Sequence, residues 1–233
     1  MPRWTSSPAS SADTDPLSLL EDLRAEHVVI ERTLGSLRTY VEARLAGADP
    51  ADAAGFIRFF RLYADAYHHA REEDTLFPAL LAHLPIREDS GPVRSLLDQH
   101  AAMKKLLVGI EPLLSGPLAD AASKARLADL AGRHRRDLLA HIDAENSVLL
   151  PEAERRLHLA GVHALEGRLP TAAERAALDE AERLASVWAP SLDPDAIRGE
   201  GCVICPSYGV SCEGLEREWW SDDEWDDFRE RSG

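Results

Sequence analysis

The feature that most limits how this chain can fold is an internal repeat with an offset of 73 residues. The segment 68–78 recurs as the segment 141–151, with the same residue types at its His, Glu, Leu and Pro positions. In the same register, His27 recurs as His100. Such self-similarity predicts two similar units that pack together around one continuous core.

Each unit has the apolar spacing of helices, because its large apolar residues recur at intervals of three and four. Gly, Pro and Asp residues divide the pattern into four long helices. A shorter helix follows them and begins after a cap at Thr171. Their expected ranges are 16–46, 51–83, 89–114 and 119–160, then 171–188. No alternating strand pattern occurs, and the links are short. The sequence therefore predicts an all-α fold, an up-down-up-down four-helix bundle with an added C-terminal helix.

Four segments are expected along the 233 residues, which suffice for one full core and a small appendage. The order is a flexible N-terminal arm, the bundle, a linker with a short helix, and an irregular acidic tail rich in Cys and Trp. Their ranges are 1–15, 16–160, 161–200 and 201–233.

The net charge of −15 argues against two classes of partner. Phosphate backbones and anionic membrane surfaces repel a polyanion, so we expect neither nucleic acid nor membrane binding. No stretch has the length of a transmembrane helix, and the N-terminus lacks the apolar run of a signal peptide. With only three cysteines, all late in the chain, a secreted disulfide framework is not expected. The cytoplasm is the expected location.

The tail contains Cys202, Cys205 and Cys212. They are read either as a second metal or redox site or as reduced thiols without a function, since a structural zinc site needs a fourth ligand. Aromatic residues alternate with acids further on, at Trp219, Trp220, Trp225 and Phe228. That pattern is typical of a peptide that docks on a protein partner or of a strap over the bundle.

Six residues of the repeat have the chemistry of metal ligands. Residues four apart share one helix face, so each His-x-x-x-Glu presents an imidazole and a carboxylate in one direction. Singly, each is more often a core histidine or a solvated acid, but the same order occurring twice favours a metal site. Imidazole with carboxylate suits iron, manganese or zinc, and carboxylates can bridge two cations. The predicted ligands are His27, His68, Glu72, His100, His141 and Glu145.

The repeat also decides between neighbouring histidines. His68 matches His141, so His69 should point about 100° away and lie at the bundle boundary. His134 is expected to pack near the site without binding metal. Pro78 and Pro151 should kink the second and fourth helices around it.

These motifs resemble the hemerythrin family, especially its bacterial HHE-type branch. The resemblance covers roughly residues 16–160 and rests on His27, on Gln99-His100, and on the two His-x-x-x-Glu segments that end in Leu-Phe-Pro or Leu-Leu-Pro. It implies a non-haem centre of two Fe ions, bridged by the two glutamates and an oxo or hydroxo group. It further implies binding of, or reaction with, dioxygen, peroxide or nitric oxide.

One position departs from the oxygen-carrying members, which have a fifth histidine where this chain has Lys104. Its repeat equivalent on the first helix is Glu31. Simple oxygen carriage is therefore in doubt. We expect Lys104 and Glu31 to lie just outside the ligands, where they interact and where Lys104 can donate a hydrogen bond and Glu31 can relay a proton or add a ligand. The alternative is that both side chains extend to solvent at the edge of the bundle.

Two other functions stay open. One is a di-iron oxidase or oxygenase that acts on a small organic substrate, and the other is iron storage, iron delivery or redox and iron sensing. An apolar pocket of roughly 300 Å³ or more beside the metals would favour the enzyme.

Overall fold

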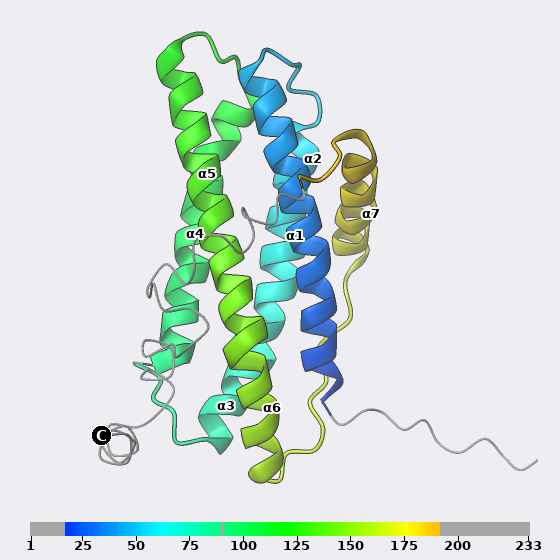
Figure 1. Ribbon diagram of the computed structural model, residues 1–233. Coiled ribbons are helices and arrows are strands. Elements are labelled where there is room, and N and C mark those ends of the chain that lie inside the picture. Colours follow the sequence, from blue (N-terminus) through cyan, green and yellow to red (C-terminus); the bar gives the residue numbers. More distant parts are fainter. Residues whose placement is uncertain (1–16, 90, 192–233) are drawn as a thin grey trace, which may run out of the picture.

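The structure, a computed structural model, describes residues 17–89 and 91–191. Regular secondary structure in these ranges is entirely helical, which confirms the all-α prediction. Four long helical stretches run alternately up and down, as Figure 1 shows. The first is α1 (Ser18–Leu45) and the third is α4 (Gly91–Ser115). The second combines α2 (Ala53–Phe59), η1 (Phe60–His69), η2 (Glu72–Leu76) and α3 (Phe77–His83), and the fourth combines α5 (Ala121–Ala144), η3 (Glu145–Leu149) and α6 (Leu150–Leu159).

The helix ends follow local sequence signals. Asp120 caps α5 by accepting a hydrogen bond from the backbone N–H of Ser123 at 2.7 Å. Gly47 and Gly161, with φ of 106° and 81°, follow the first and fourth stretches in a conformation that suits glycine. A polar cap accepts hydrogen bonds from backbone N–H groups that the start of a helix leaves unpaired. A glycine after the last turn lets the chain leave the helix where its final carbonyl groups lack partners.

Two segments of the bundle are π-helical at repeat-equivalent positions. These are η2, which begins at Glu72, and η3, which begins at Glu145. Each directly precedes the short α-helix that contains the matching proline, Pro78 or Pro151. Because a π-helical turn is wider than an α-helical one and its hydrogen bonds skip one residue more, it accommodates a following proline ring. The same widening displaces the glutamates from ideal α-helical positions, a common feature of functional sites.

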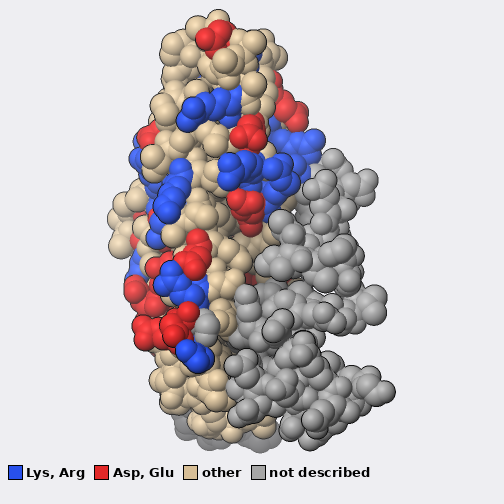
Figure 2. Space-filling model, turned by 90° about the vertical axis from the view of Figure 1, so that its left-hand side faces the viewer, with Lys and Arg blue, Asp and Glu red and all other residues tan. Residues whose placement is uncertain are grey.

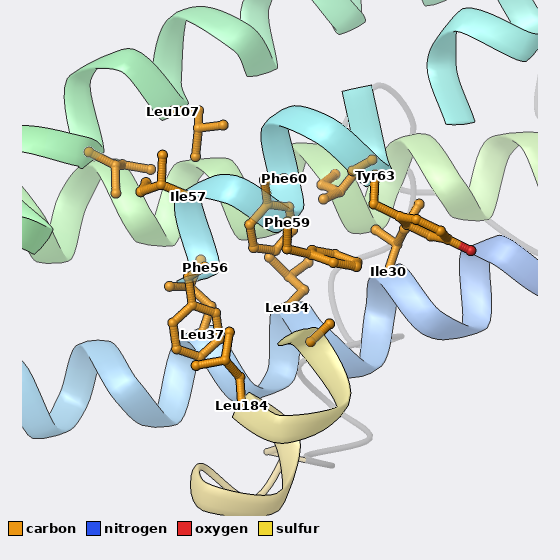
Figure 3. Packing of buried hydrophobic residues seen from close by; sticks show 14 of the residues in the cluster. Ile30, Leu34, Leu37, Phe56, Ile57, Phe59, Phe60, Tyr63, Leu107 and Leu184 are labelled. Atoms are coloured by element: carbon orange, nitrogen blue, oxygen red, sulfur yellow. The ribbon is translucent and has the colours of Figure 1, made fainter. Parts of the chain in front are cut away.

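The core consists of two hydrophobic clusters with a polar layer between them. The large cluster contains Ile30, Leu34 and Leu37 of α1 packed against Phe56 and other aromatics of α2 and η1, as Figure 3 shows. The small cluster lies at the opposite end and includes residues of α1, α3 and α6. Apolar packing on both sides therefore excludes water from the layer where the two clusters meet.

A fifth helix, α7 (Ala172–Val187), lies alongside α1 and α2 (Figure 1). Thr171 begins it with the predicted cap, accepting a hydrogen bond from the Glu174 N–H at 3.3 Å. At its other end, the Trp188 indole donates to Asp52 at 2.8 Å and packs edge-on against Tyr40. The appended helix therefore covers the large cluster of the bundle.

On the face drawn in Figure 2, Lys and Arg side chains are interspersed with Asp and Glu side chains. Within the described part of the chain, every helix is too short or too polar to cross a membrane. The expected arm at 1–15 and the expected tail at 201–233, with Cys202, Cys205 and Cys212, lie outside the described residues.

Candidate metal centre

The six residues predicted as ligands meet in the polar layer between the two clusters. Each is at most 1% exposed, and they come from all four stretches of the bundle. On α1, for example, His27 lies between Leu23 of the small cluster and Ile30 of the large one. Their ligand atoms form two groups, each with all atoms within 4.8 Å of one another. The groups are His27, His68, Glu72 and Glu145, and Glu72, His100, His141 and Glu145.

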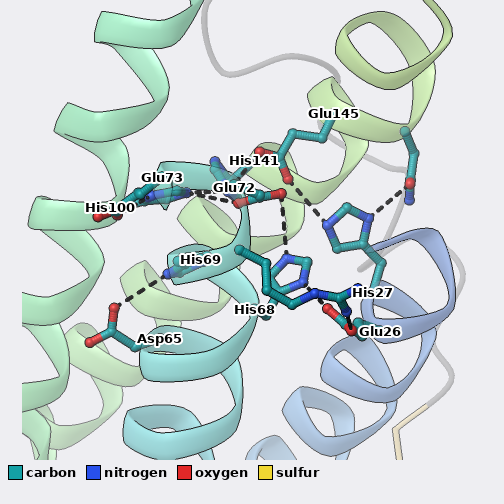
Figure 4. A network of polar contacts seen from close by, with 12 residues as sticks. Glu26, His27, Asp65, His68, His69, Glu72, Glu73, His100, His141 and Glu145 are labelled. Carbon is teal, nitrogen blue, oxygen red and sulfur yellow. Dashed lines mark hydrogen bonds and ion pairs between the residues drawn. The ribbon is translucent and has the colours of Figure 1, made fainter. Parts of the chain in front are cut away.

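Both groups contain the same two carboxylates, and the Nε2 atoms of the four imidazoles point toward them (Figure 4). Glu145 lies 3.2 Å from His27 and 3.3 Å from His141. Glu72 lies 3.4 Å from His100 and 3.7 Å from His68. Two nitrogen pairs that share two carboxylates can hold two neighbouring cations.

The other ring nitrogen of each of these histidines has a partner. The Nδ1 atoms of His27, His68, His100 and His141 lie 2.8, 2.8, 2.7 and 2.9 Å from oxygens of Asn146, Glu26, Glu73 and Gln99, respectively. A partner on Nδ1 orients the ring and leaves Nε2 free to bind a metal. Sequence reasoning did not assign these roles. The only available signal was adjacency, because all four partners directly neighbour a predicted ligand in the chain.

Arg71 anchors one of these partners. Its guanidinium pairs with Glu26 and donates to Asp22 at 2.6 Å and to the Tyr67 hydroxyl at 3.0 Å. Burial raises the pKa of Glu26 to about 7, and the charge of Arg71 acts in the opposite direction. The ion pair with Arg71 thus stabilises the buried carboxylate of Glu26 beside His68.

Without metal, the buried site contains polar groups that are poorly matched. Burial and the charge of Glu145 raise the pKa of Glu72 to about 7. Burial acts to lower the pKa of His27, but its hydrogen bond with Glu145 and the nearby negative charges raise it to about 9. The Nε2 atoms of His27 and His68 and all four glutamate oxygens have no hydrogen-bond partner. Buried polar atoms without partners are rare. Here they point toward one another at the centre of the layer, an arrangement that fits a bound pair of metal ions.

His69 does not lie where sequence reasoning placed it. The prediction of a boundary position is wrong, since His69 is only 4% exposed and stacks on His100 with ring centroids 3.9 Å apart. The prediction assumed α-helical rotation. His69 instead ends the π-helical segment η1, whose wider turns separate successive side chains by a smaller angle. His134 packs edge-on against Phe60, as expected for a histidine near the site.

Lys104 lies at the surface beside the centre. Its side chain is 46% exposed, and its ammonium lies 2.9 Å from Asp65 and 3.9 Å from Glu73. Glu31 is half-buried on α1 and belongs to none of the ligand groups. Lys104 is thus connected to the site through these two carboxylates, because Glu73 accepts a hydrogen bond from the His100 ring.

A small cavity lies beside the site. Its lining includes His69, Lys104, His134 and Met103, and it offers about 20 Å³ to a water-sized molecule. That volume is enough for one water molecule or a molecule of similar size. It is far below the roughly 300 Å³ at which pockets for organic ligands begin.

Comparison with known proteins agrees with the geometry of this site. The family model of the hemerythrin HHE cation-binding domain matches residues 18–153. Searches of curated proteins and of solved structures returned no match. The matched range contains all six predicted ligands and more than half of the chain, and the chain therefore belongs to the hemerythrin HHE cation-binding family.

Proposed function

We propose that the protein holds two iron ions and binds or reacts with dioxygen, peroxide or nitric oxide. The observation that carries this proposal is the pair of buried carboxylates shared by two sets of histidines. Beside them lies a cavity with room for a molecule about as small as dioxygen. His27 and His68 would hold one ion, His100 and His141 the other, and Glu72 and Glu145 would bind both. Bound iron would supply redox chemistry and positions for small ligands.

The chain itself would orient the ligands and exclude water. The Nδ1 partners fix the imidazole rings, and the hydrophobic clusters on both sides keep bulk solvent out of the layer. The cavity of about 20 Å³ favours a diatomic molecule or peroxide over a small organic substrate, although an oxidase, an iron store and an iron sensor remain alternative functions.

Lys104 is proposed to control protons at the cavity that it lines. Its ammonium, paired with Asp65, can donate a hydrogen bond to a molecule that enters. Glu31, one helical turn after His27, is proposed as a proton relay or an additional ligand. We also propose a cytoplasmic location, a protein partner for the tail and a metal or redox site at its cysteines.

Metal analysis tests the first part of the proposal. Protein from iron-replete cells should contain about two irons per chain, since two carboxylates can bridge one pair of cations. Glu72→Ala and Glu145→Ala should each lose most of the metal. His134→Leu, a change in a buried histidine without a carboxylate partner, is the matched control and should keep it. A single tightly held zinc ion would contradict the proposal.

Reactivity tests the second part. The protein is reduced without air, exposed separately to dioxygen, peroxide and nitric oxide, and followed by optical spectroscopy. A rapid spectral change with at least one of them is expected. Iron that is released on reduction, with no spectral response to any of the three, would instead identify an iron store.

The role of Lys104 is tested with Lys104→Met, which keeps the apolar stem and removes the charge. The reaction should slow by about tenfold or more while the iron content stays the same, as expected for a lost proton donor. Lys105→Met, a change at the exposed neighbouring lysine, is the control. Equal rates for the two variants and the parent would show that Lys104 has no part in the reaction.

A further inference from the structure

His69 has the surroundings of a metal ligand rather than of a packing residue. Its ring lies parallel to that of His100, at 13°, and edge-on to that of His141 with centroids 5.5 Å apart. Each of these three histidines offers one ring nitrogen, and the three nitrogens lie within 4.8 Å of one another. His69 therefore faces the half of the centre that His100 and His141 form.

The orientation of His69 also repeats that of the four predicted ligand histidines. Those rings direct Nδ1 to an outer oxygen and Nε2 to the centre. The His69 Nδ1 lies 3.6 Å from the Asp65 carboxylate, and Figure 4 shows Asp65 on the side away from Glu72 and Glu145. Like those of His134, both ring nitrogens of His69 are buried without a hydrogen-bond partner, because the Nδ1 contact with Asp65 is longer than a hydrogen bond, and its Nε2 lies on the side of the centre (Figure 4). A buried imidazole nitrogen that points at other imidazole nitrogens is well explained by a shared cation.

His134 provides the contrast. It is equally buried, at 3% exposure, and both of its ring nitrogens lack partners. Its ring packs against Phe60, however, and it belongs to none of the groups of candidate ligand atoms. Burial alone thus does not distinguish the two histidines, whereas the position relative to His100 and His141 does.

We propose that His69 is a fifth histidine ligand, on the metal ion held by His100 and His141. This inference rests on the proposed metal pair. It makes the centre unequal, with three nitrogens on one ion and two, from His27 and His68, on the other. Lys104 faces the same Asp65 carboxylate from α4, so it supports the ring of His69 instead of replacing a ligand.

The test uses protein loaded with Co²⁺ and proton NMR. Co²⁺ shifts the exchangeable Nδ1 proton of each bound imidazole far from the diamagnetic region, so the number of shifted exchangeable signals equals the number of Nε2-bound histidines. The parent protein should show five such signals, one for each of the histidines in the candidate groups. His69→Leu should lose one signal and bind one of its two ions about tenfold more weakly or worse, whereas His134→Leu should keep all five.

Four signals in the parent protein would overturn the inference even if His69→Leu failed to fold, because that count needs no variant. An unchanged spectrum in a folded His69→Leu would overturn it as well. Both outcomes leave two bound ions and thus differ from a failure of the proposed function, in which the parent would bind no pair of ions. Asp65→Asn adds an independent check, since it should move the His69 signal more than the other four.

Discussion

Removing the metal should destabilise the fold strongly, because the polar layer lies in the middle of the core. Six ligand atoms of His27, His68, Glu72 and Glu145 are buried without a hydrogen-bond partner. Each such atom costs about 1–3 kcal/mol when nothing satisfies it. Protonation of His27 and His100 without metal would recover about half of this, which leaves a loss of roughly 3–9 kcal/mol.

That loss is large relative to the stability of ordinary domains, about 5–15 kcal/mol. For a domain of this size, about 1 kcal/mol corresponds to roughly 2–4 °C in melting temperature, so the metal-free protein should melt roughly 6–36 °C below the loaded one. The assay is thermal unfolding followed by circular dichroism, with a chelator-treated sample and the same sample after metal is restored.

A double variant separates loss of the metal from the effect of buried charges. Glu72→Gln with Glu145→Gln keeps the side-chain shape, removes both negative charges and adds amide donors for the imidazole Nε2 atoms. Without metal, this variant should melt above the metal-free parent, because neutral groups of similar volume often replace buried ion pairs without loss. A metal-free parent that melts within about 5 °C of the loaded protein would refute the reasoning. So would a double variant that is no more stable than the metal-free parent.

Three other predictions concern protons and packing. Without metal, nearby carboxylates raise the pKa values of His27 and His100 to about 9 against the effect of burial, so metal binding near pH 7 should release about two protons per chain. Apparent affinity should therefore rise with pH until about pH 9, and calorimetry in buffers of different ionisation enthalpy that detects no release would contradict this. In α2, a Cβ on Gly55 would lie 2.6 Å from Glu180 and 3.2 Å from Leu184, so Gly55→Ala should lower the urea-unfolding free energy by about 1–3 kcal/mol. Gly132→Ala, where a Cβ meets only an arginine end at 3.5 Å, should raise it by about 0.5–1 kcal/mol, and equal effects of both changes would show that contact with α7 is unimportant. Thr171→Ala removes the cap of α7 and should lower stability by about 1 kcal/mol, which a urea titration can detect or exclude.

The part of the centre that could be predicted is the part that repetition encodes. The His-x-x-x-Glu segments and the single histidines are visible because they recur at one offset and because residues four apart share a helix face. Helix ends were predictable for a similar reason, since caps such as Thr171 and terminal glycines such as Gly161 act within a few residues of the chain.

The outer partners could not be predicted, because each joins residues that are far apart in the chain. Asn146 meets His27 across 119 positions, and Glu26 meets His68 across 42. A polar residue beside a ligand in the sequence is a weak signal, since which facing helix it reaches depends on how the bundle packs. Lys104 illustrates the same limit, because its contacts with Asp65 and Glu73 depend on the separation of α4 from the second stretch.

The sequence by itself determined the helical bundle, its two halves and six of the residues that meet in its core, because these depend on local spacing and on repetition. Only the tertiary structure decided the place of His69, the partners of the imidazole rings and the small size of the adjoining cavity. These features depend on π-helical turns and on the packing of facing helices. Both result from the balance of contacts across the whole core, which no short stretch of sequence contains.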